Sequence, residues 1–177
     1  MSLSPDELRR NLPPEARERI LRENWHSHDA RWFLKVAVEC GFDLANRLNQ
    51  VTLRSMARTE MKRLMEAAGC NGVETMEGLT HLVDLACEIY FAPPMLEAEV
   101  KATGRDSIAG TVTRCLVQEE VDRAGVRGLY ECACGSRHEG WLEACGFTGE
   151  VRIVKSMLRG DSCCEVSMTS IARQSDR

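Results

Sequence analysis

The residues best suited to chemistry lie in the second half of the chain, where thiols from separate segments accompany an imidazole. Cys115 ends a predicted strand, while Cys132 and Cys134 form a C-x-C in a loop that enters a helix. A thiol at a helix N-terminus has its pKa lowered by the aligned backbone dipoles, so Cys134 is the predicted nucleophile. His138 follows one turn later and is predicted to act as its general base.

Two further thiols, Cys163 and Cys164, are adjacent on a predicted strand, so their side chains face opposite ways. At most one of them can join the site of Cys134, and we assign Cys164 to it. Two other interpretations stay open: the cysteines are small buried hydrophobes, or they bind zinc or iron. The metal set would be Cys115, Cys134, His138 and Cys164, although their spacing matches no C-x2-C pair.

In the first half of the chain, Asp29 and Glu60 fall on apolar helical stripes, and Trp32 shares the stripe of Asp29. A buried carboxylate is costly unless it is paired or hydrogen-bonded. The simpler interpretation pairs each carboxylate with an arginine such as Arg31 or Arg63. The alternative directs both carboxylates into a pocket between the two halves.

These candidates require a set of elements to position them. Apolar spacing of three and four predicts helices, the first beginning at Pro5 and the others covering about 14–21, 26–40, 43–68 and 75–90. Pro93 and Pro94 then break the chain. Beyond them, alternation predicts strands at 96–102, 108–115, 151–157 and 163–171, with helices at 116–124 and 136–144.

This order predicts an α+β fold: an N-terminal helical segment packed on a four-stranded antiparallel sheet, with helices inserted between strands 2 and 3. We expect a helical region over 1–92 and a cysteine-rich α/β module over 95–172, together forming one compact unit.

Bulk composition excludes several classes of protein. The chain has 177 residues and a net charge of −4, with 44% hydrophobic and 28% charged residues, and no basic face indicates a nucleic-acid partner. It lacks an apolar run of the roughly 18 residues that would cross a bilayer, and its N-terminus has no signal-peptide core. Nine cysteines, an odd number, fit a reducing compartment. We expect a cytoplasmic protein without membrane or nucleic-acid partners.

Three stretches carry a family resemblance: T-R-C-L-V-Q-E-E-V-D-R-A-G, Y-E-C-A-C-G and R-G-D-S-C-C-E-V. They resemble the bacterial L-2-amino-thiazoline-4-carboxylic acid hydrolase family, whose closing motif is matched by Gly160, Asp161, Cys163, Cys164 and Glu165. The segment W-H-S-H-D-A-R-W-F-L-K-V-A is similar to uncharacterised cytosolic relatives of that family. The order of elements is also similar to the 4-vinyl reductase domain, a small-molecule-binding α+β module. The resemblance covers roughly residues 22 to 171.

The resemblance implies a hydrolase that opens a small cyclic C–N or amidine-like bond. Cys134 would attack, His138 would move protons, and Cys115 and Cys164 would line the pocket. A substrate carboxylate would need a cation. The residues expected to bind substrate are Arg114 or Arg137 for that carboxylate, with Asp29, Trp32, Glu60 and Asp161.

Two non-catalytic hypotheses stay open beside the hydrolase. The chain could be a binding or sensing module for a small hydrophobic ligand or for a metal such as zinc or iron. Alternatively, its helical half could dock a protein partner, and homodimerisation through that half is compatible with the sequence.

Overall fold

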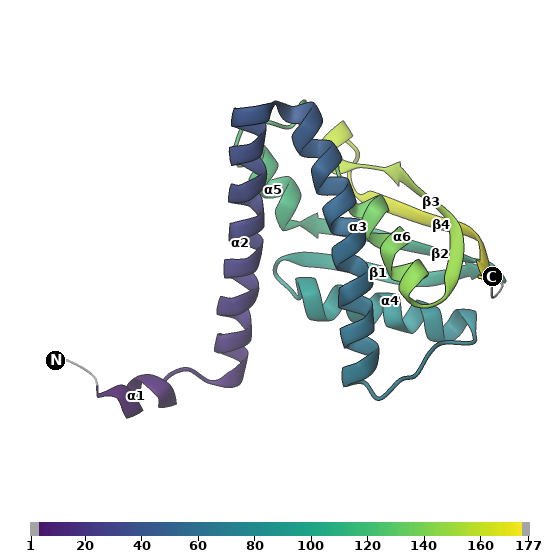
Figure 1. Cartoon of the computed structure of the whole chain (residues 1–177), viewed down its shortest axis with the longest axis horizontal. Coiled ribbons are helices and arrows are strands. Elements are labelled where there is room, and N and C mark those ends of the chain that lie inside the picture. The colour runs from purple at the N-terminus through teal and green to yellow at the C-terminus, as the bar shows by residue number, and fades with distance from the viewer. Residues whose placement is uncertain (1–3, 175–177) are drawn as a thin grey trace.

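A computed structural model describes residues 4–174 and shows an α+β protein, as the sequence predicts (Figure 1). Four strands form one antiparallel sheet, and the long helices precede it in the chain. The elements are α1 (Pro5–Arg10), α2 (Pro14–Cys40), α3 (Phe42–Ala67), α4 (Met76–Phe91), β1 (Leu96–Gly104), β2 (Ser107–Cys115), α5 (Leu116–Arg123), α6 (Cys134–Ala144), β3 (Phe147–Lys155), the 3-10 turn η1 (Met157–Arg159) and β4 (Cys164–Arg173).

The sheet has the order β1-β2-β4-β3, so the last strand enters between the second and the third. Residue pairs such as Ile108 with Met168 fix the β2–β4 register, and Ile153 with Val166 fixes that of β3 with β4. Because β2 and β4 are antiparallel neighbours, Cys115 at the end of β2 and Cys164 at the start of β4 lie at the same end of the sheet. Val112 of β2 pairs directly with Cys164.

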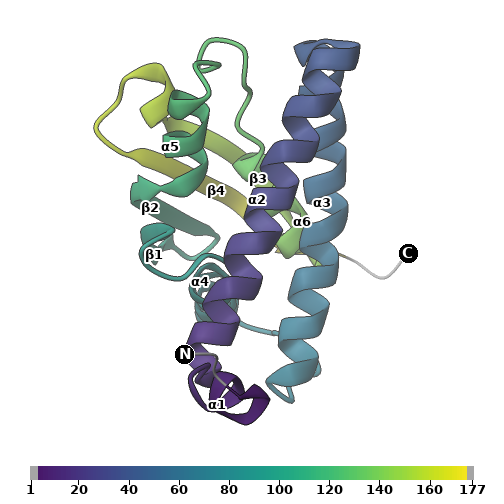
Figure 2. The ribbon, with the colours of Figure 1, turned by 90° about the vertical axis from the view of Figure 1, so that its left-hand side faces the viewer.

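Helices α4 and α6 pack on the sheet, α3 packs on α6, and α2 runs beside α3 (Figures 1 and 2). A single hydrophobic cluster runs through these layers, from Met61 of α3 and Leu79 of α4 to Trp141 of α6 and Met168 of β4. Burial of such side chains contributes about 1.5–3 kcal/mol each. The helical half and the cysteine-rich half therefore share one core.

Helices α2 and α3 form an antiparallel hairpin that turns at Gly41. The φ angle of Gly41 is 87°, a conformation that glycine adopts without the steric penalty of a Cβ atom. Near the turn, Phe33 and Ala37 of α2 pack against Ala45 of α3 in a second, smaller hydrophobic cluster. The sequence predicted the stop at residue 41 correctly, and the glycine conformation explains it.

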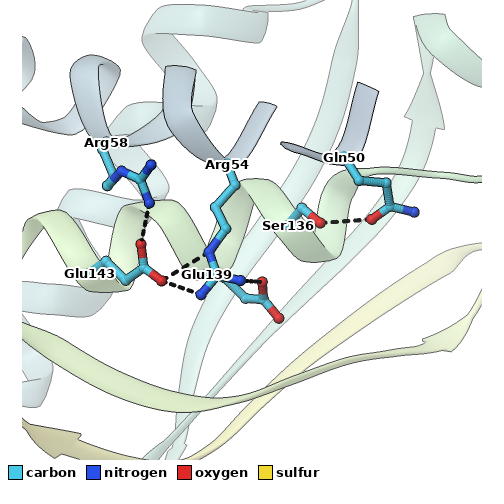
Figure 3. Close-up of polar contacts among 6 residues, drawn as sticks. All are labelled: Gln50, Arg54, Arg58, Ser136, Glu139 and Glu143. Carbon is cyan, nitrogen blue, oxygen red and sulfur yellow. Dashed lines mark hydrogen bonds and ion pairs between the residues drawn. The ribbon is translucent and has the colours of Figure 1, made fainter. Parts of the chain in front are cut away.

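Polar side chains join α3 to α6 along the outer side of their contact (Figure 3). Arg54 is ion-paired with Glu139 at 2.8 Å and with Glu143, and Arg58 donates to Glu143 at 2.7 Å. In the same row, Ser136 donates to the side-chain oxygen of Gln50 at 2.7 Å. Each exposed ion pair contributes little to the free energy of unfolding. Together, however, the four contacts along this helix pair fix the rotation and register of α6 on α3.

The structure corrects several predicted boundaries. Residues 14–21 and 26–40 were expected to form separate helices, yet they belong to the single helix α2, because residues 22–25 include neither glycine nor proline. The third strand was expected at 151–157 but runs from Phe147, where pairing with Arg173 extends it beyond the alternating segment. Helix α6 begins at Cys134, two residues before the predicted start.

The α3–α6 packing makes a prediction about Gly140. A Cβ atom at this position would lie 2.8 Å from Cβ of Ala57 and would also overlap the carbonyl oxygen of Arg54. We expect Gly140→Ala to force the helices apart and to lower the free energy of unfolding by about 1–3 kcal/mol, measured by urea denaturation.

Gly135→Ala on the same helix is the matched control, because nothing lies within 4 Å of the position of its Cβ atom. It should leave the unfolding midpoint unchanged or slightly raised, since alanine has the higher helix propensity. Equal stability of the two variants would contradict the close packing of α3 and α6.

Candidate functional site

A cavity of about 560 Å³ lies between α2 and the rest of the molecule. Its volume is within the range of about 300–1,000 Å³ that is typical of small-molecule sites. Helix α2 forms one wall, and α3, α5, the Phe91–Met95 segment and the residues around the start of α6 form the others. The apolar side chains of its lining include Phe33, Leu34, Leu53, Phe91, Met95, Leu116, Val117, Val121 and Tyr130.

Arginines dominate the charged residues of the cavity. Six arginines line it against three carboxylates, although the whole chain has a net charge of −4. The arginines are Arg19, Arg22, Arg31, Arg114, Arg123 and Arg137, and the carboxylates are Glu23, Asp29 and Glu120. Four of these arginines are ion-paired, with Glu23, Glu119, Glu120 and Glu60. The remaining two, Arg22 and Arg31, supply the positive potential that favours an anionic group at the apolar cavity.

Helix α2 is held over the cavity by contacts with the C-terminal end of α4. The Nε2 atom of His26 lies 3.1 Å from the carbonyl oxygen of Tyr90, and its ring packs on Phe91 at 5.1 Å between centroids. Arg22 donates to the carbonyl oxygen of Ile89 at 3.1 Å. Burial lowers the pKa of His26, so the ring contributes packing and a hydrogen bond as a neutral group.

One amide side chain of α3 forms hydrogen bonds with the loop that precedes α6. Asn46 is 3% exposed; it donates to the carbonyl oxygen of Leu129 at 2.8 Å and accepts from the backbone N–H of Glu131 at 3.0 Å. In the same loop, the ring of Tyr130 packs edge-on against Phe33 at 5.2 Å. These contacts fix the position of the backbone that carries Cys132 and Cys134.

Arg137 is the cavity residue with a buried counter-ion. Its guanidinium lies 3.2 Å from Oε1 of Glu60 and stacks on the ring of Phe91 at 4.6 Å, and its side chain is 8% exposed. The other oxygen of Glu60 accepts from the indole N–H of Trp141 at 3.0 Å. Glu60 is 1% exposed, and this burial raises its pKa, while Arg137 and Trp141 act in the opposite direction. Arg63, the partner suggested by the sequence, is not the one found.

Four thiols converge beside the cavity, from β2, the loop before α6, the start of α6 and the start of β4. The thiols of Cys132 and Cys134 are hydrogen-bonded to each other. Cys115 and Cys164 are near enough to Cys132 to affect each other's ionisation, and the backbone N–H of Met157 lies 3.3 Å from the sulfur of Cys164. Cys134 contributes to the cavity wall.

The pKa values of these thiols differ from the sequence prediction. The hydrogen bond from Cys134 lowers the pKa of Cys132 to about 7, and the nearby charges of Arg137 and Arg159 act in the same direction. The same pairing, together with burial, raises the pKa of Cys134. Sequence reasoning assigned the activated thiol to Cys134 from the helix dipole alone. Cys132, two residues earlier, is the thiol with the lowered pKa, because its thiolate accepts a hydrogen bond from the thiol of Cys134.

His138 lies one turn into α6, as predicted, but its ring makes other contacts. Its Nδ1 atom is 2.8 Å from the carbonyl oxygen of Cys134, and the ring packs edge-on against Trp141 at 5.0 Å. A carbonyl accepts only from a protonated nitrogen, so Nδ1 carries the proton. Burial lowers the pKa of His138, so the ring is a neutral packing residue that caps a backbone oxygen.

The remaining predicted substrate residues are scattered. Asp29 and Arg114 line the cavity, and Arg114 is ion-paired with Glu119 at 2.8 Å. Trp32 is 51% exposed and lies outside the cavity lining. Asp161 accepts from the backbone N–H of Ser156 at 2.7 Å and so stabilises the turn before β4.

The metal prediction is wrong for the part of the chain that the structure describes. In residues 4–174 no group of three or more His, Cys, Asp or Glu side chains is placed to hold a metal ion. The predicted set of Cys115, Cys134, His138 and Cys164 fails because Nδ1 of His138 is bound to a carbonyl oxygen and Cys134 is hydrogen-bonded to Cys132. Over the same residues, no helix is long and apolar enough to cross a membrane.

Cavity and sheet together define a class of protein: an α+β module with a ligand-sized cavity beneath a helical hairpin. Comparison of the chain with models of protein families gave no match. Comparison with curated proteins also gave none. Among solved structures, the chain is similar to trafficking protein particle complex subunit 3 from Naegleria fowleri, covalently bound to palmitic acid. The TM-score is 0.67 at 13% identity, with 90% of this chain and 99% of that chain covered, so the two share a fold.

This comparison corrects the hydrolase prediction. The similar structure is a subunit of a trafficking complex, and the arrangement of His138 and Cys134 offers no thiol–imidazole pair. The family resemblance rested on short cysteine motifs, which are compatible with several functions on one fold.

Sequence reasoning also missed residues that build the site. Cys132 was noted only as part of the C-x-C, and neither Asn46 nor Tyr130 was singled out. Tyr130 immediately precedes the C-x-C segment, and Asn46 is a polar residue at a position that α3 buries. The sequence carries no comparable signal for Asn46, because its burial appears only when the loop before α6 packs on α3.

The buried ion pair predicts a large effect of neutralising Glu60. Glu60→Gln leaves the guanidinium of Arg137 buried without a counter-charge, and we expect the free energy of unfolding to fall by about 3–5 kcal/mol in urea denaturation. Glu66→Gln on the exposed side of the same helix is the control and should change it by less than about 0.5 kcal/mol. A small effect of Glu60→Gln would show that the pair does not hold α3 and α6 together.

The thiol pair predicts a pH dependence. The lowered pKa of Cys132 means that its thiolate forms above about pH 7, so its alkylation by iodoacetamide should accelerate through that pH. In Cys134→Ala the hydrogen bond is lost, and the inflection should move toward about 8.5, the ordinary pKa of a thiol. Mass spectrometry of the modified peptide measures both rates; identical profiles would exclude activation of Cys132 by Cys134.

Proposed function

We propose that this protein is a non-catalytic binding module for an anionic amphiphile, with an acyl chain of fatty-acid size in the cavity beneath α2. The observation that carries the proposal is the cavity itself: about 560 Å³, with apolar walls and arginines in its lining. An apolar tail gains free energy by leaving water, at about 0.8 kcal/mol for each buried methylene. A carboxylate or similar head group is attracted by the guanidinium groups.

The positions of the apolar and basic residues support this choice of ligand. Phe33 and Leu53 belong to the helical hairpin, and Leu116 and Val121 face them from the region of α5, so a tail would be enclosed between two elements. Arg114 pairs with Glu119 through its Nε atom at 2.8 Å, and its side chain is 42% exposed, so its terminal N–H groups can still reach a head group. Arg137 is already compensated by Glu60, so it supports the cavity wall more than it adds free charge.

Two likenesses agree with a binding function. The Naegleria fowleri subunit of similar fold is covalently bound to palmitic acid, a fatty acid of the proposed class. The order of elements also resembles the 4-vinyl reductase domain, a small-molecule-binding module. Both are reasons to test a fatty acid first, and the chemistry of the cavity selects an amphiphile independently of them.

Binding of a series of saturated fatty acids to the purified full chain tests the proposal. Affinity, measured by displacement of a fluorescent fatty acid, should increase about fourfold for each added methylene until the cavity is filled. Palmitate should bind more tightly than its methyl ester, because the ester lacks the charge that the arginines attract. Intact mass under denaturing conditions separates bound from covalently attached ligand.

A matched pair of tryptophan variants on α2 places the ligand. Ala30 lines the cavity, so Ala30→Trp should fill part of it and weaken palmitate binding by about tenfold or more. Val38 is 76% exposed on the same helix and outside the cavity lining, so Val38→Trp should bind like the unmodified protein. Absence of palmitate binding, or equal affinity of the two variants, would exclude this cavity as an acyl site.

A further inference from the structure

We propose that the cavity binds its amphiphile in one direction, with the charged head group beside Arg22 and the acyl chain directed toward the turn between α2 and α3. The inference rests on the proposed function and deepens it, because it assigns the residue that recognises the head group. Arg22 is then the specificity-determining residue for an anionic ligand, and Arg114 supplies further N–H donors at the same end of the cavity.

The part of the cavity lining that α2 contributes changes in character along the helix. In the first half of the helix the lining residues are charged or polar, namely Arg19, Arg22, Glu23, His26 and Ser27. After Asp29 they become mostly apolar, namely Ala30, Phe33 and Leu34. Arg31 lies among these, but its guanidinium donates to the carbonyl oxygen of Ser27 at 3.3 Å, so it is directed back along the helix and away from the turn.

The charged end of the cavity adjoins the connection between α4 and β1. Arg22 donates through its Nε atom to the carbonyl oxygen of Ile89 at 3.1 Å. The backbone N–H of Leu116 donates to the carbonyl oxygen of Met95 at 2.7 Å, which brings Arg114 to the same connection. Within residues 4–174 Arg22 forms no ion pair, so the N–H groups at the tip of its guanidinium are available to a carboxylate.

The opposite end of the cavity is apolar and enclosed. Phe33 is 8% exposed, and its ring packs edge-on against Tyr130 at 5.2 Å and against Phe42 at 6.2 Å. Helix α5 lies alongside the half of α2 that leads into the turn, and its lining residue Val121 is 7% exposed (Figures 1 and 2). A tail at this end is therefore surrounded by apolar side chains from several elements.

Exposure of the arginines shows which end of the cavity is open to solvent. The side chain of Arg19 is 64% exposed and that of Arg114 is 42% exposed, so the charged end is accessible. An amphiphile that enters there places its tail first and leaves its head group beside the cations. The reverse direction would bury a carboxylate among Phe33, Tyr130 and Val121, where no cation compensates its lost hydration.

The distance along α2 suits an extended acyl chain. Arg22 and Leu34 are separated by about 18 Å along the helix axis, from a rise of about 1.5 Å per residue. This separation is comparable with the length of an extended palmitoyl chain. A single molecule of palmitate can therefore reach from the charged end of the cavity to the enclosed one.

The charge preference of the ligand tests the role of Arg22. Affinities of the purified full chain for palmitate and for methyl palmitate are measured by displacement of a fluorescent fatty acid. We expect Arg22→Gln to weaken palmitate binding by about tenfold or more and to leave methyl palmitate unchanged, because only the carboxylate uses the guanidinium. The unchanged affinity for the ester shows at the same time that the variant is folded.

Lys35→Gln is the matched control for the loss of one positive charge on the same helix. Lys35 is exposed and lies outside the cavity lining, so this variant should keep the preference of the unmodified chain for palmitate over its ester.

A palmitate analogue with a photoreactive diazirine near its methyl end reports the direction of binding. Trypsin releases peptide 32–35 with Phe33 and Leu34, peptide 128–137 with Tyr130, and peptide 64–101 with the connection from α4 to β1. After irradiation of the complex, mass spectrometry should find the label in peptides 32–35 and 128–137. Excess unlabelled palmitate should remove it.

The outcomes separate this inference from the proposed function on which it rests. Predominant labelling of peptide 64–101 would show that the ligand binds in the reverse direction. A greater loss of palmitate affinity in Arg31→Gln than in Arg22→Gln, or an undiminished preference for palmitate in Arg22→Gln, would exclude Arg22 as the head-group residue. Each of these results leaves acyl binding in place, whereas absence of saturable palmitate binding by the unmodified chain would reject both proposals.

Discussion

The buried carboxylate of Glu60 is the constraint on which the arrangement of this protein depends. A charged or protonatable group with 1% exposure is tolerated only where partners satisfy both oxygens. Arg137 and Trp141 supply those partners, and both belong to α6, which is distant from Glu60 in sequence. Helix α6 therefore has one acceptable rotation on α3. The close approach at Gly140 and the outer row of ion pairs from Arg54 and Arg58 are compatible with that rotation alone.

The cavity follows from this placement. When α6 is fixed, Arg137 stacks on Phe91 and the start of α6 faces α2 across the cavity, with Tyr130 packed on Phe33 at one side. Helix α2 contacts the end of α4 through His26 and Arg22 and the hairpin turn through Phe33 and Ala37. Between these two anchoring regions a space remains beneath α2, and it is lined by apolar side chains and arginines.

The same placement brings the thiols together. Antiparallel pairing of β2 with β4 puts Cys115 and Cys164 at one end of the sheet, and the loop tied to Asn46 brings Cys132 and Cys134 to that end. Which thiol ionises depends on the hydrogen bond between neighbours and on Arg137 and Arg159, rather than on the dipole of α6 alone. The cavity and the cysteine cluster thus meet at Cys134, which belongs to both, whereas Cys132 is not among the residues that line the cavity.

The sequence by itself determined the α+β class, the stop at Gly41, the break at the proline pair and the convergence of cysteines on the second half, because periodicity and backbone preferences are local properties. It did not determine that 14–40 is one helix, nor that Phe147 begins a strand, since both depend on what the segment packs against. Only the tertiary structure decided that Glu60 pairs with Arg137, that Trp32 faces solvent, that His138 binds a backbone carbonyl and that Cys132 is the ionisable thiol. The physical reason is that ion pairing, burial and pKa depend on distances between groups far apart in the chain, and those distances exist only after α6 has packed on α3.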